Sequence, residues 1–274
     1  MSARQQIVLL TGGSSGIGAE TARMLAEAGF KVYAASRRGT VSEQCAALAN
    51  VVPAVMDVND QQSVENAVAD IVAKEGRLDA VVCNAGNGIA GAVEQTSVDE
   101  AKYQFETCFF GAHRVIRQVL PHMRAQGFGR IITISSVAAV VPIPYQTFYS
   151  SAKAAVLIYT KALSLEVKGF GIQCCSVLPG DTKTGFTAAR KVTAESEDKE
   201  SVYYETLKKS VGRMEHDEQN GMPASKIAGA IVRQLKKRRM AATVTPRFDY
   251  KAINLLVRLL PTKLMLWIVG KLYA

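Results

Sequence analysis

The first 30 residues constrain the fold more than any other part of the chain. Residues 7–10, IVLL, form a continuous apolar run, which predicts a strand buried on both faces. The glycine-rich segment TGGSSGIG follows at residues 11–18, and apolar residues then recur at helical spacing up to Phe30. A strand, a glycine turn and a helix in this order predict the start of a βαβ unit.

The alternation of strands and helices continues to about residue 244, which predicts right-handed crossovers and a parallel sheet. Further strands are expected at 31–36, 51–56, 78–83, 130–135, 172–178 and 241–244, and helices at 64–74, 98–124, 149–167 and 224–237. We therefore predict an α/β fold, a single doubly wound Rossmann-type domain over residues 1–250, whose parallel sheet is flanked by helices. Within it, about 181–222 is interpreted as a substrate-loop insertion, and 251–274 as an apolar, basic C-terminal helical extension of the same domain.

The glycines of the first turn suit a dinucleotide. Gly12 permits a tight turn, Gly16 lets the backbone approach a phosphate, and Gly18 lets the helix pack against the sheet. The helix N-terminus adds free N–H groups and a partial positive charge, which favour a pyrophosphate. In this context we expect nucleotide binding rather than an ordinary tight turn.

Four motifs occur in order along the chain. Residues 11–18 read Thr-Gly-x-x-x-Gly-x-Gly, residues 84–86 read Asn-Ala-Gly after an expected strand, Tyr149 and Lys153 form Tyr-x-x-x-Lys, and residues 179–180 are Pro-Gly. Together these motifs resemble the classical short-chain dehydrogenase/reductase family. The C-terminal extension is similar to that of lipid-, steroid- and retinoid-acting branches. The resemblance implies hydride transfer between a nicotinamide cofactor and a carbonyl or secondary alcohol.

Tyr149 and Lys153 are four residues apart, so a helix places them on one face. A free tyrosine has a pKa of ~10, and a nearby ammonium stabilises the phenolate and lowers that pKa. The resemblance implies that Tyr149 exchanges a proton with the substrate oxygen and that Lys153 tunes Tyr149 and holds the nicotinamide ribose. It also implies a serine that polarises the substrate oxygen. Spacing favours Ser136, with Ser135 as the neighbouring alternative.

One position departs from the family pattern. Many members carry an asparagine three residues before a glycine in the long helix, and alignment on Gly111 places Cys108 there. A thiol is a poor substitute for an amide in hydrogen bonding. The departure puts the family's proton relay in doubt, although hydride transfer itself does not require that relay.

The segment after the second expected strand indicates the cofactor. It offers no carboxylate for a ribose diol; instead Ser36 is neutral and Arg37 is suited to grip a 2′-phosphate, which favours NADP(H). The alternative is that Arg37 and Arg38 are solvated loop charges. The residues expected to bind the cofactor are Gly12, Ser14, Ser15, Gly16, Ile17, Gly18, Arg37, Asp57, Val58, Asn84, Ala85, Gly86, Tyr149, Lys153, Pro179, Gly180 and Thr182.

The cysteines and histidines argue against a metal site. The chain has five cysteines in mostly apolar surroundings, without a Cys-x-x-Cys pattern, and only three histidines. We expect no metal. The odd cysteine count and the missing signal peptide favour a reducing, cytoplasmic setting.

Positive charge is concentrated at the C-terminal end. Residues 225–274 hold 11 of the 33 basic residues but only one of the 24 acidic residues, Asp249. This asymmetry indicates either an anionic partner or a solvated helix face at residues 236–239. We expect no nucleic acid, because the chain carries no zinc finger, RNA-recognition motif or aromatic-basic platform.

Residues 253–272, INLLVRLLPTKLMLWIVGKL, are apolar but too interrupted to span a membrane. Arg258 and Lys263 lie inside the segment, and Pro261 breaks it, so we expect two short amphipathic helices that meet at Pro261. They either close the substrate pocket, form a subunit interface or dock peripherally on a membrane.

The function expected from these features is that of an NADP(H)-dependent carbonyl reductase or alcohol dehydrogenase. Apolar residues in the 181–222 insertion favour a small hydrophobic substrate, namely a steroid, a retinoid or a lipid-like molecule. The alternative is a non-catalytic NADP(H)-binding sensor or scaffold on the same fold. We expect a homo-oligomer, either a dimer or a tetramer.

Overall fold

A seven-stranded parallel sheet forms the centre of the protein in its computed structural model, which describes residues 4–273. The strand order is β11-β7-β6-β4-β1-β2-β3, and every pairing in this sheet is parallel. The strands are β1 (Ile7–Thr11), β2 (Lys31–Ser36), β3 (Val51–Val55), β4 (Ala80–Cys83), β6 (Gly129–Ile134), β7 (Ile172–Val177) and β11 (Thr243–Val244). The predicted doubly wound parallel sheet is confirmed.

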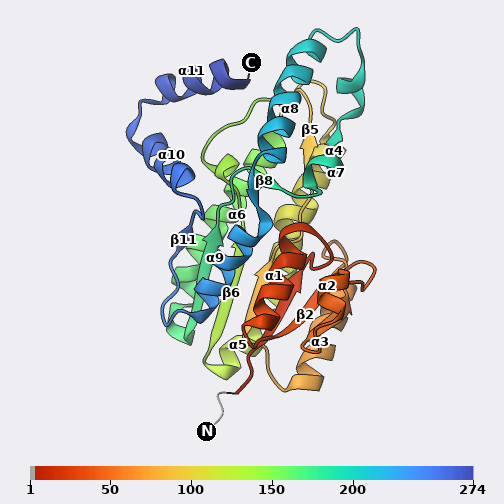
Figure 1. Ribbon diagram of the computed structural model, residues 1–274, viewed down its shortest axis with the longest axis vertical. Helices are drawn as coiled ribbons and strands as arrows, with labels where there is room; N and C mark the ends of the chain where they lie inside the picture. The colour runs from red at the N-terminus through yellow and green to blue at the C-terminus, as the bar shows by residue number, and fades with distance from the viewer. Residues whose placement is uncertain (1–3, 274) are drawn as a thin grey trace.

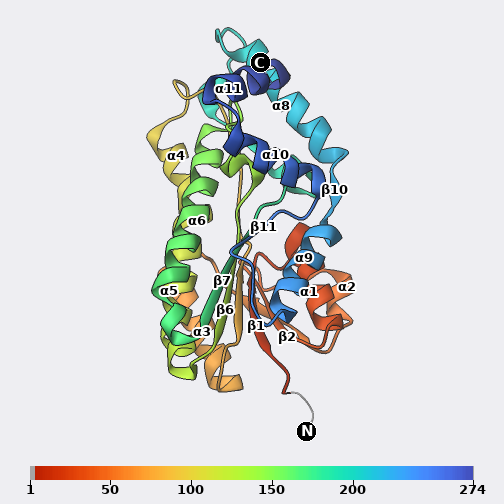
Figure 2. The same cartoon turned by 90° about the vertical axis from the view of Figure 1, so that its left-hand side faces the viewer.

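Helices cover both faces of the sheet, which Figure 2 shows nearly edge-on. One face carries α1 (Gly16–Glu27), α2 (Glu43–Ala46) and α9 (Ala224–Lys236), and the other carries α3 (Gln61–Glu75), α5 (Gly111–Gln126) and α6 (Thr147–Glu166). Because strand side chains alternate, Leu9 enters the core under α5 and Leu10 enters the core under α1. Both leucines are fully buried, as the continuous apolar run predicted.

The long helix expected at 98–124 is interrupted. It consists of α4 (Val98–Phe105), a five-residue π-helical turn η1 (Glu106–Phe110) and α5. The wider turn holds Cys108, which is buried, and is followed by Gly111, where an added Cβ would lie 2.8 Å from Val58 Cγ2. Local π-helical turns often occur at functional sites, and apolar periodicity alone did not indicate this one.

Residues 181–222 lie beyond the carboxyl ends of the strands and carry small elements of their own (Figure 1). Two short parallel ladders hold the segment: β8 pairs with β10, and β9 pairs with β5, which follows β4. The elements are β5 (Ile89–Ala90), β8 (Thr182–Lys183), α7 (Phe186–Ala189), β9 (Lys191–Val192), η4 (Ala194–Glu197), α8 (Tyr204–Gln219) and β10 (Met222–Pro223). Two further 3-10 turns are η2 (Val137–Ala139) and η3 (Lys168–Phe170).

Two C-terminal helices, α10 (Phe248–Leu259) and α11 (Thr262–Tyr273), lie at the same end of the molecule as α8 (Figures 1 and 2). The chain turns between them at Leu260 and Pro261, as the proline predicted. Tyr250 fastens the base of α10, because its hydroxyl donates to Asp181 Oδ2 at 2.5 Å. Within residues 4–273, the structure contains no helix that is long and apolar enough to cross a membrane.

Candidate active site

A pocket with a volume of about 1230 Å³ opens at the carboxyl ends of the central strands. From β1 the chain builds one half of the sheet through β2 and β3, and from β4 it builds the other half. Such a reversal of strand order is where doubly wound sheets bind their ligands. Every residue that the sequence assigned to catalysis or to cofactor binding lines this one pocket.

The glycine turn forms a cradle at the N-terminus of α1. Gly12 and Gly16 have φ of +66° and +53°, in the left-handed region that favours glycine. A Cβ on Gly18 would lie 2.0 Å from the Gly12 carbonyl oxygen, so only glycine allows α1 to begin here. The first turn of α1 holds no acidic residue, and the Ser15 side chain makes no capping hydrogen bond. Free amides at this end fit a pyrophosphate.

The Asn-Ala-Gly motif braces that cradle from the neighbouring strand. Thr11 Oγ1 accepts hydrogen bonds from the backbone N–H groups of Asn84 and Ala85, both at 3.0 Å. Asn84 Nδ2 donates to the Thr11 carbonyl at 3.0 Å and to the Gly12 carbonyl at 3.2 Å. These bonds hold the glycine turn in place, so the Asn-Ala-Gly motif supports the turn that residues 11–18 form.

One end of the pocket is positively charged. Ser36, Arg37 and Arg38 line it, and both arginines are exposed. Within the described chain, neither arginine forms an ion pair with a carboxylate, so both guanidinium groups are available to an anion. Asp57 lines the same end with its carboxylate turned to the Asn59 N–H at 3.0 Å, and Val58 follows it.

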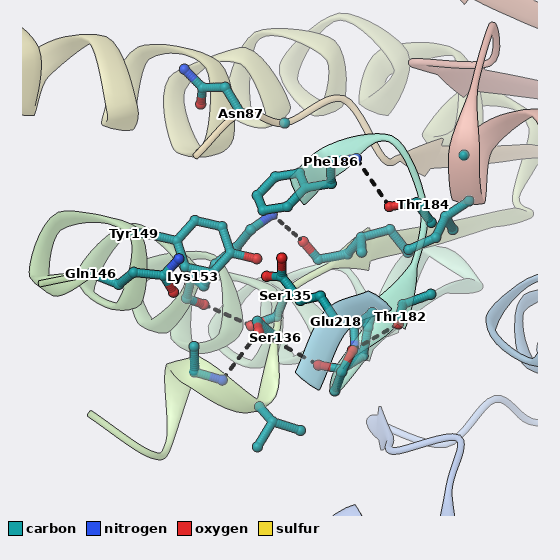
Figure 3. A pocket seen from close by; sticks show the side chains of 18 of the residues that line it. Asn87, Ser135, Ser136, Gln146, Tyr149, Lys153, Thr182, Thr184, Phe186 and Glu218 are labelled. Carbon is teal, nitrogen blue, oxygen red and sulfur yellow. Dashed lines mark hydrogen bonds between the residues drawn. The ribbon is translucent and has the colours of Figure 1, made fainter. Parts of the chain in front are cut away.

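Tyr149 and Lys153 project from the first turns of α6 into the middle of the pocket (Figure 3). The buried Lys153 Nζ lies 5.7 Å from the centre of the Tyr149 ring and donates to the Ile134 carbonyl at 2.9 Å. Burial of the phenol raises the pKa of Tyr149, whereas the Lys153 charge and a hydrogen bond with Ser136 lower it. Burial has the largest effect, so the pKa of Tyr149 is raised, which favours the protonated phenol, the form that donates a proton.

The two neighbouring serines have different surroundings. The Ser135 hydroxyl is buried and donates to the Lys153 carbonyl at 2.8 Å, so it braces α6. The Ser136 hydroxyl instead bonds Tyr149, as described above; it also makes a long 3.5 Å contact to the Pro179 carbonyl and accepts from the Ala138 N–H at 3.1 Å. Its proton is therefore the more available one beside Tyr149.

Pro179, Gly180 and Thr182 follow β7 and form the wall beside these serines. The Pro179 carbonyl accepts from the Val137 N–H at 2.8 Å, and Thr182 Oγ1 donates to the Gly180 carbonyl at 2.7 Å. The segment is thus rigid at the point where the 181–222 insertion begins.

A cluster of polar side chains lies close to Lys153. Of its members, the sequence analysis singled out only Cys108. Gln104 is fully buried, and its amide nitrogen donates to Cys108 Sγ at 3.1 Å and to the Asn87 carbonyl at 3.0 Å. Cys108 Sγ lies 3.4 Å from Asn87 Oδ1. A Cβ on Gly86 would lie 3.5 Å from Lys153 Nζ and 3.6 Å from Cys108 Sγ. The sequence analysis did not single out Asn87; its place directly after the Asn-Ala-Gly motif is the signal that could have found it.

The insertion adds an aromatic ring and two partly buried carboxylates to the pocket. The Phe186 ring centre lies 5.7 Å from that of Tyr149 (Figure 3). Behind it, Arg190 forms a buried ion pair with Glu218, which also accepts from Thr187 Oγ1 at 2.7 Å. Burial raises the pKa values of Glu218 and of Asp181. The sequence indicated an insertion beside the site with apolar residues to contact the substrate, but it assigned no role to these carboxylates.

The structure shows no metal site among the cysteines, histidines and acidic residues that it describes. Over residues 4–273, the structure brings together no group of three or more histidine, cysteine, aspartate or glutamate side chains that would hold a metal ion. All five cysteines are free and buried, and burial raises the pKa values of the Cys83, Cys174 and Cys175 thiols to about 12.

Two solved structures share this fold at low sequence identity. A short-chain dehydrogenase/reductase from Burkholderia phymatum in complex with NAD has a TM-score of 0.80 and 22% identity, covering 93% of this chain and 94% of that one. ElxO with NADP bound has a TM-score of 0.76 and 24% identity, covering 91% and 100%. These similarities concern the fold alone, and the two neighbours hold different nicotinamide dinucleotides.

Sequence comparison identifies the family. The description "short chain dehydrogenase" belongs to the family whose model matches residues 6–195. A relative from Bacteroides thetaiotaomicron, named 3-ketodihydrosphingosine reductase, is 40% identical over 266 residues, which cover 96% of this chain and 93% of the relative. Because the family match spans more than half of the chain and this relative spans nearly all of it, the chain belongs to the short-chain dehydrogenase/reductase family of oxidoreductases.

Proposed function

We propose that the protein is an NADP(H)-dependent oxidoreductase that transfers a hydride between nicotinamide and the carbonyl or secondary alcohol of a hydrophobic, lipid-like substrate. The observation that carries the proposal is the continuity of one pocket. It runs from the two unpaired arginines, past Tyr149, to the apolar inner side of α10 and α11. Such a pocket accommodates a phosphorylated dinucleotide at one end and an apolar chain at the other.

The assignment of the cofactor residues follows their positions along the pocket. The amides of the glycine turn, with Ser14, Ser15 and Ile17, would bind the pyrophosphate. Arg37 would bind the 2′-phosphate as a planar fork, which favours NADP(H) over NAD(H). Asp57 and Val58 would contact the adenine. The nicotinamide half would lie against residues 84–86, Lys153 and the wall formed by Pro179, Gly180 and Thr182.

The bound nicotinamide supplies or accepts the hydride, and the protein handles the proton. In reduction, Tyr149 donates its phenolic proton to the carbonyl oxygen, which becomes the hydroxyl of the product. Ser136 donates a hydrogen bond to the same oxygen and stabilises the charge that develops on it. Lys153 stabilises the resulting phenolate through its positive charge. In oxidation, Tyr149 removes the proton.

The apolar end of the pocket supports a long-chain lipid over a compact polar substrate. Eight apolar residues of the two C-terminal helices and the turn between them line it: Ile253, Leu256, Val257, Leu260, Met265, Ile268, Val269 and Leu272. The Bacteroides relative is named for a ketone on the long-chain base dihydrosphingosine. We therefore propose the 3-ketone of a sphingoid base as the first substrate to test, with steroids and retinoids as the other candidates.

The test measures the oxidation of NADPH and of NADH with 3-ketodihydrosphingosine, a steroid ketone, retinal, an acyl ketone and a quinone. We expect turnover with NADPH and the sphingoid ketone. Tyr149→Phe keeps the ring and removes only the proton carrier, so it should abolish turnover and retain NADPH binding. A variant that keeps more than a tenth of kcat, a loss of under ~1.4 kcal/mol, would exclude Tyr149 as the proton donor. NADPH binding without turnover of any carbonyl would favour the sensor or scaffold.

We also infer a homo-oligomer, a dimer or a tetramer, in the cytoplasm. Phe110 and Ile158 support a subunit interface, because they are 46% and 62% exposed on neighbouring helical segments. Light scattering coupled to gel filtration measures the mass directly. A monomer at all protein concentrations would contradict this inference.

A further inference from the structure

The two C-terminal helices are apolar on two sides. Their inner side lines the substrate pocket, as described above. A second set of large apolar residues does not line the pocket and faces solvent: Phe248, Leu255 and Leu259 on α10, which are 83%, 59% and 71% exposed, and Leu266 and Trp267 on α11, which are 50% and 61% exposed. We call this set the outer face. Five large apolar side chains exposed on two consecutive helices point to an interaction site.

Positive charges border the outer face. Lys251 and Arg258 lie within one helical turn of Leu255, and Lys263 and Lys271 lie four residues on either side of Trp267. Between residues 250 and 273 the sequence holds no acidic residue. None of these four cations forms an ion pair with another described residue. The outer face therefore combines apolar side chains with uncompensated positive charge.

The combination of apolar and positively charged side chains indicates which partner the outer face can bind. A second copy of the chain in two-fold contact would bring two positively charged faces together, which is unfavourable. An anionic bilayer offers both an apolar interior and negative headgroups, and amphipathic helices with lysine, arginine and tryptophan bind there. Trp267 suits the interface between headgroups and acyl chains.

We propose that the outer face of α10 and α11 docks on an anionic lipid bilayer, while the inner face of the same helices receives the lipid substrate. The proposal extends to the route of the substrate: a lipid ketone leaves the bilayer beneath these helices and enters the pocket towards Tyr149. The docking step stands on the outer face alone, whereas the route rests on the proposed function.

Tyr250, in the first turn of α10, connects the C-terminal helices to the wall of the active site. The Tyr250 hydroxyl accepts a hydrogen bond from the Asp181 N–H at 3.1 Å and donates one to the Asp181 carboxylate. A Cβ on Gly180 would lie 2.3 Å from the Tyr250 ring, so the ring packs directly on the wall beside Ser136. The docked helices are thus anchored to the pocket at one point.

The chain carries its own probe for docking, because Trp267 is its only tryptophan. The experiment adds vesicles of phosphatidylglycerol and phosphatidylcholine, or of phosphatidylcholine alone, to the wild-type protein and records tryptophan emission. We expect a blue shift and quenching by brominated acyl chains with the anionic vesicles, both weakened at high salt. Emission that anionic vesicles leave unchanged at low salt would overturn the proposal, and equal binding to both vesicle types would contradict the role of the cations.

Two matched substitutions locate the docking surface. Leu259→Glu places a carboxylate on the outer face, whereas Val55→Glu makes the same change of charge at a residue of the far edge strand β3 that is 65% exposed. Sedimentation with anionic vesicles should fall at least tenfold in Leu259→Glu and stay at the wild-type level in Val55→Glu. An equal loss in both variants would overturn the proposal. A changed oligomeric mass in Leu259→Glu without lipid would also overturn it, because the outer face would then be a subunit interface.

Activity separates docking from the proposed function. Leu259 lies outside the pocket, so Leu259→Glu should reduce a short water-soluble ketone at the wild-type rate and a vesicle-embedded lipid ketone at least tenfold more slowly. Wild-type protein that binds vesicles but reduces no lipid ketone would refute the proposed substrate and leave docking supported. Equal rates of the two proteins on the embedded ketone would refute the route through the bilayer.

Discussion

Replacing Lys153 by methionine tests how the protein controls the proton of Tyr149. The Lys153 ammonium lies 5.7 Å from the centre of the Tyr149 ring. At an effective dielectric constant of about 20, a unit charge at this distance stabilises the phenolate by roughly 3 kcal/mol. That energy corresponds to a change of about a hundredfold in the ratio of phenolate to phenol. Methionine replaces the apolar stem of lysine with an unbranched stem of similar length and removes the charged ammonium group.

The two directions of the reaction should respond differently. Alcohol oxidation needs the phenolate, so its kcat at neutral pH should fall about a hundredfold, and its rise with pH should move to higher pH. Carbonyl reduction needs the protonated phenol, which the substitution favours, so its loss at alkaline pH should also move upward. The assay records kcat against pH in both directions at saturating cofactor, because Lys153→Met should also weaken cofactor binding.

Lys161→Met is the matched control, since Lys161 lies on the same helix, about 12 Å further along its axis. Its charge is screened at that distance, so its pH profiles should match those of the wild type. Melting temperatures of both variants check that they fold. If Lys153→Met left both pH profiles where the wild type has them, Lys153 would not set the proton affinity of Tyr149, and the reasoning from charge would be refuted.

Three further substitutions address the cofactor site and the π-helical turn. Arg37→Asp should lower the ratio of kcat/KM with NADPH to that with NADH by about 10- to 150-fold, because a charged hydrogen bond contributes roughly 1.5–3 kcal/mol; an unaltered ratio would mean that another group binds the 2′-phosphate. Gly18→Ala would bring a Cβ to 2.0 Å from the Gly12 carbonyl oxygen, so thermal unfolding should occur at lower temperature and NADPH should no longer raise it; wild-type behaviour would show that the turn opens without cost. Cys108→Asn should retain activity or increase it, because an amide can donate to Asn87 Oδ1, now 3.4 Å from the thiol; a severe loss would show that the buried space does not admit the larger side chain.

The strands of the sheet and the pocket motifs were predictable because they depend on short stretches of chain. The apolar run of β1 is buried on both faces, so continuous apolarity was sufficient to find this strand. Tyr149 and Lys153 share a helix face at a spacing of four, which the sequence shows directly. The interrupted helix at Cys108 was not predictable in this way, because apolar periodicity does not distinguish a five-residue π-helical turn from the α-helices on either side of it. Gly111, directly after the turn, packs closely on Val58, a residue far away in sequence.

The sequence by itself determined the doubly wound sheet, the glycine cradle and the Tyr149–Lys153 pair, since each follows from residue type and local spacing. Only the tertiary structure decided which serine has the freer hydroxyl, because the bond from Ser135 to Lys153 depends on how α6 packs against β6. It also joined Tyr250 to Asp181, 69 positions apart. The tertiary structure also decided the roles of the two sides of α10 and α11. Periodicity shows that a helix is apolar, but only packing determines which of its residues line a pocket and which remain exposed to solvent.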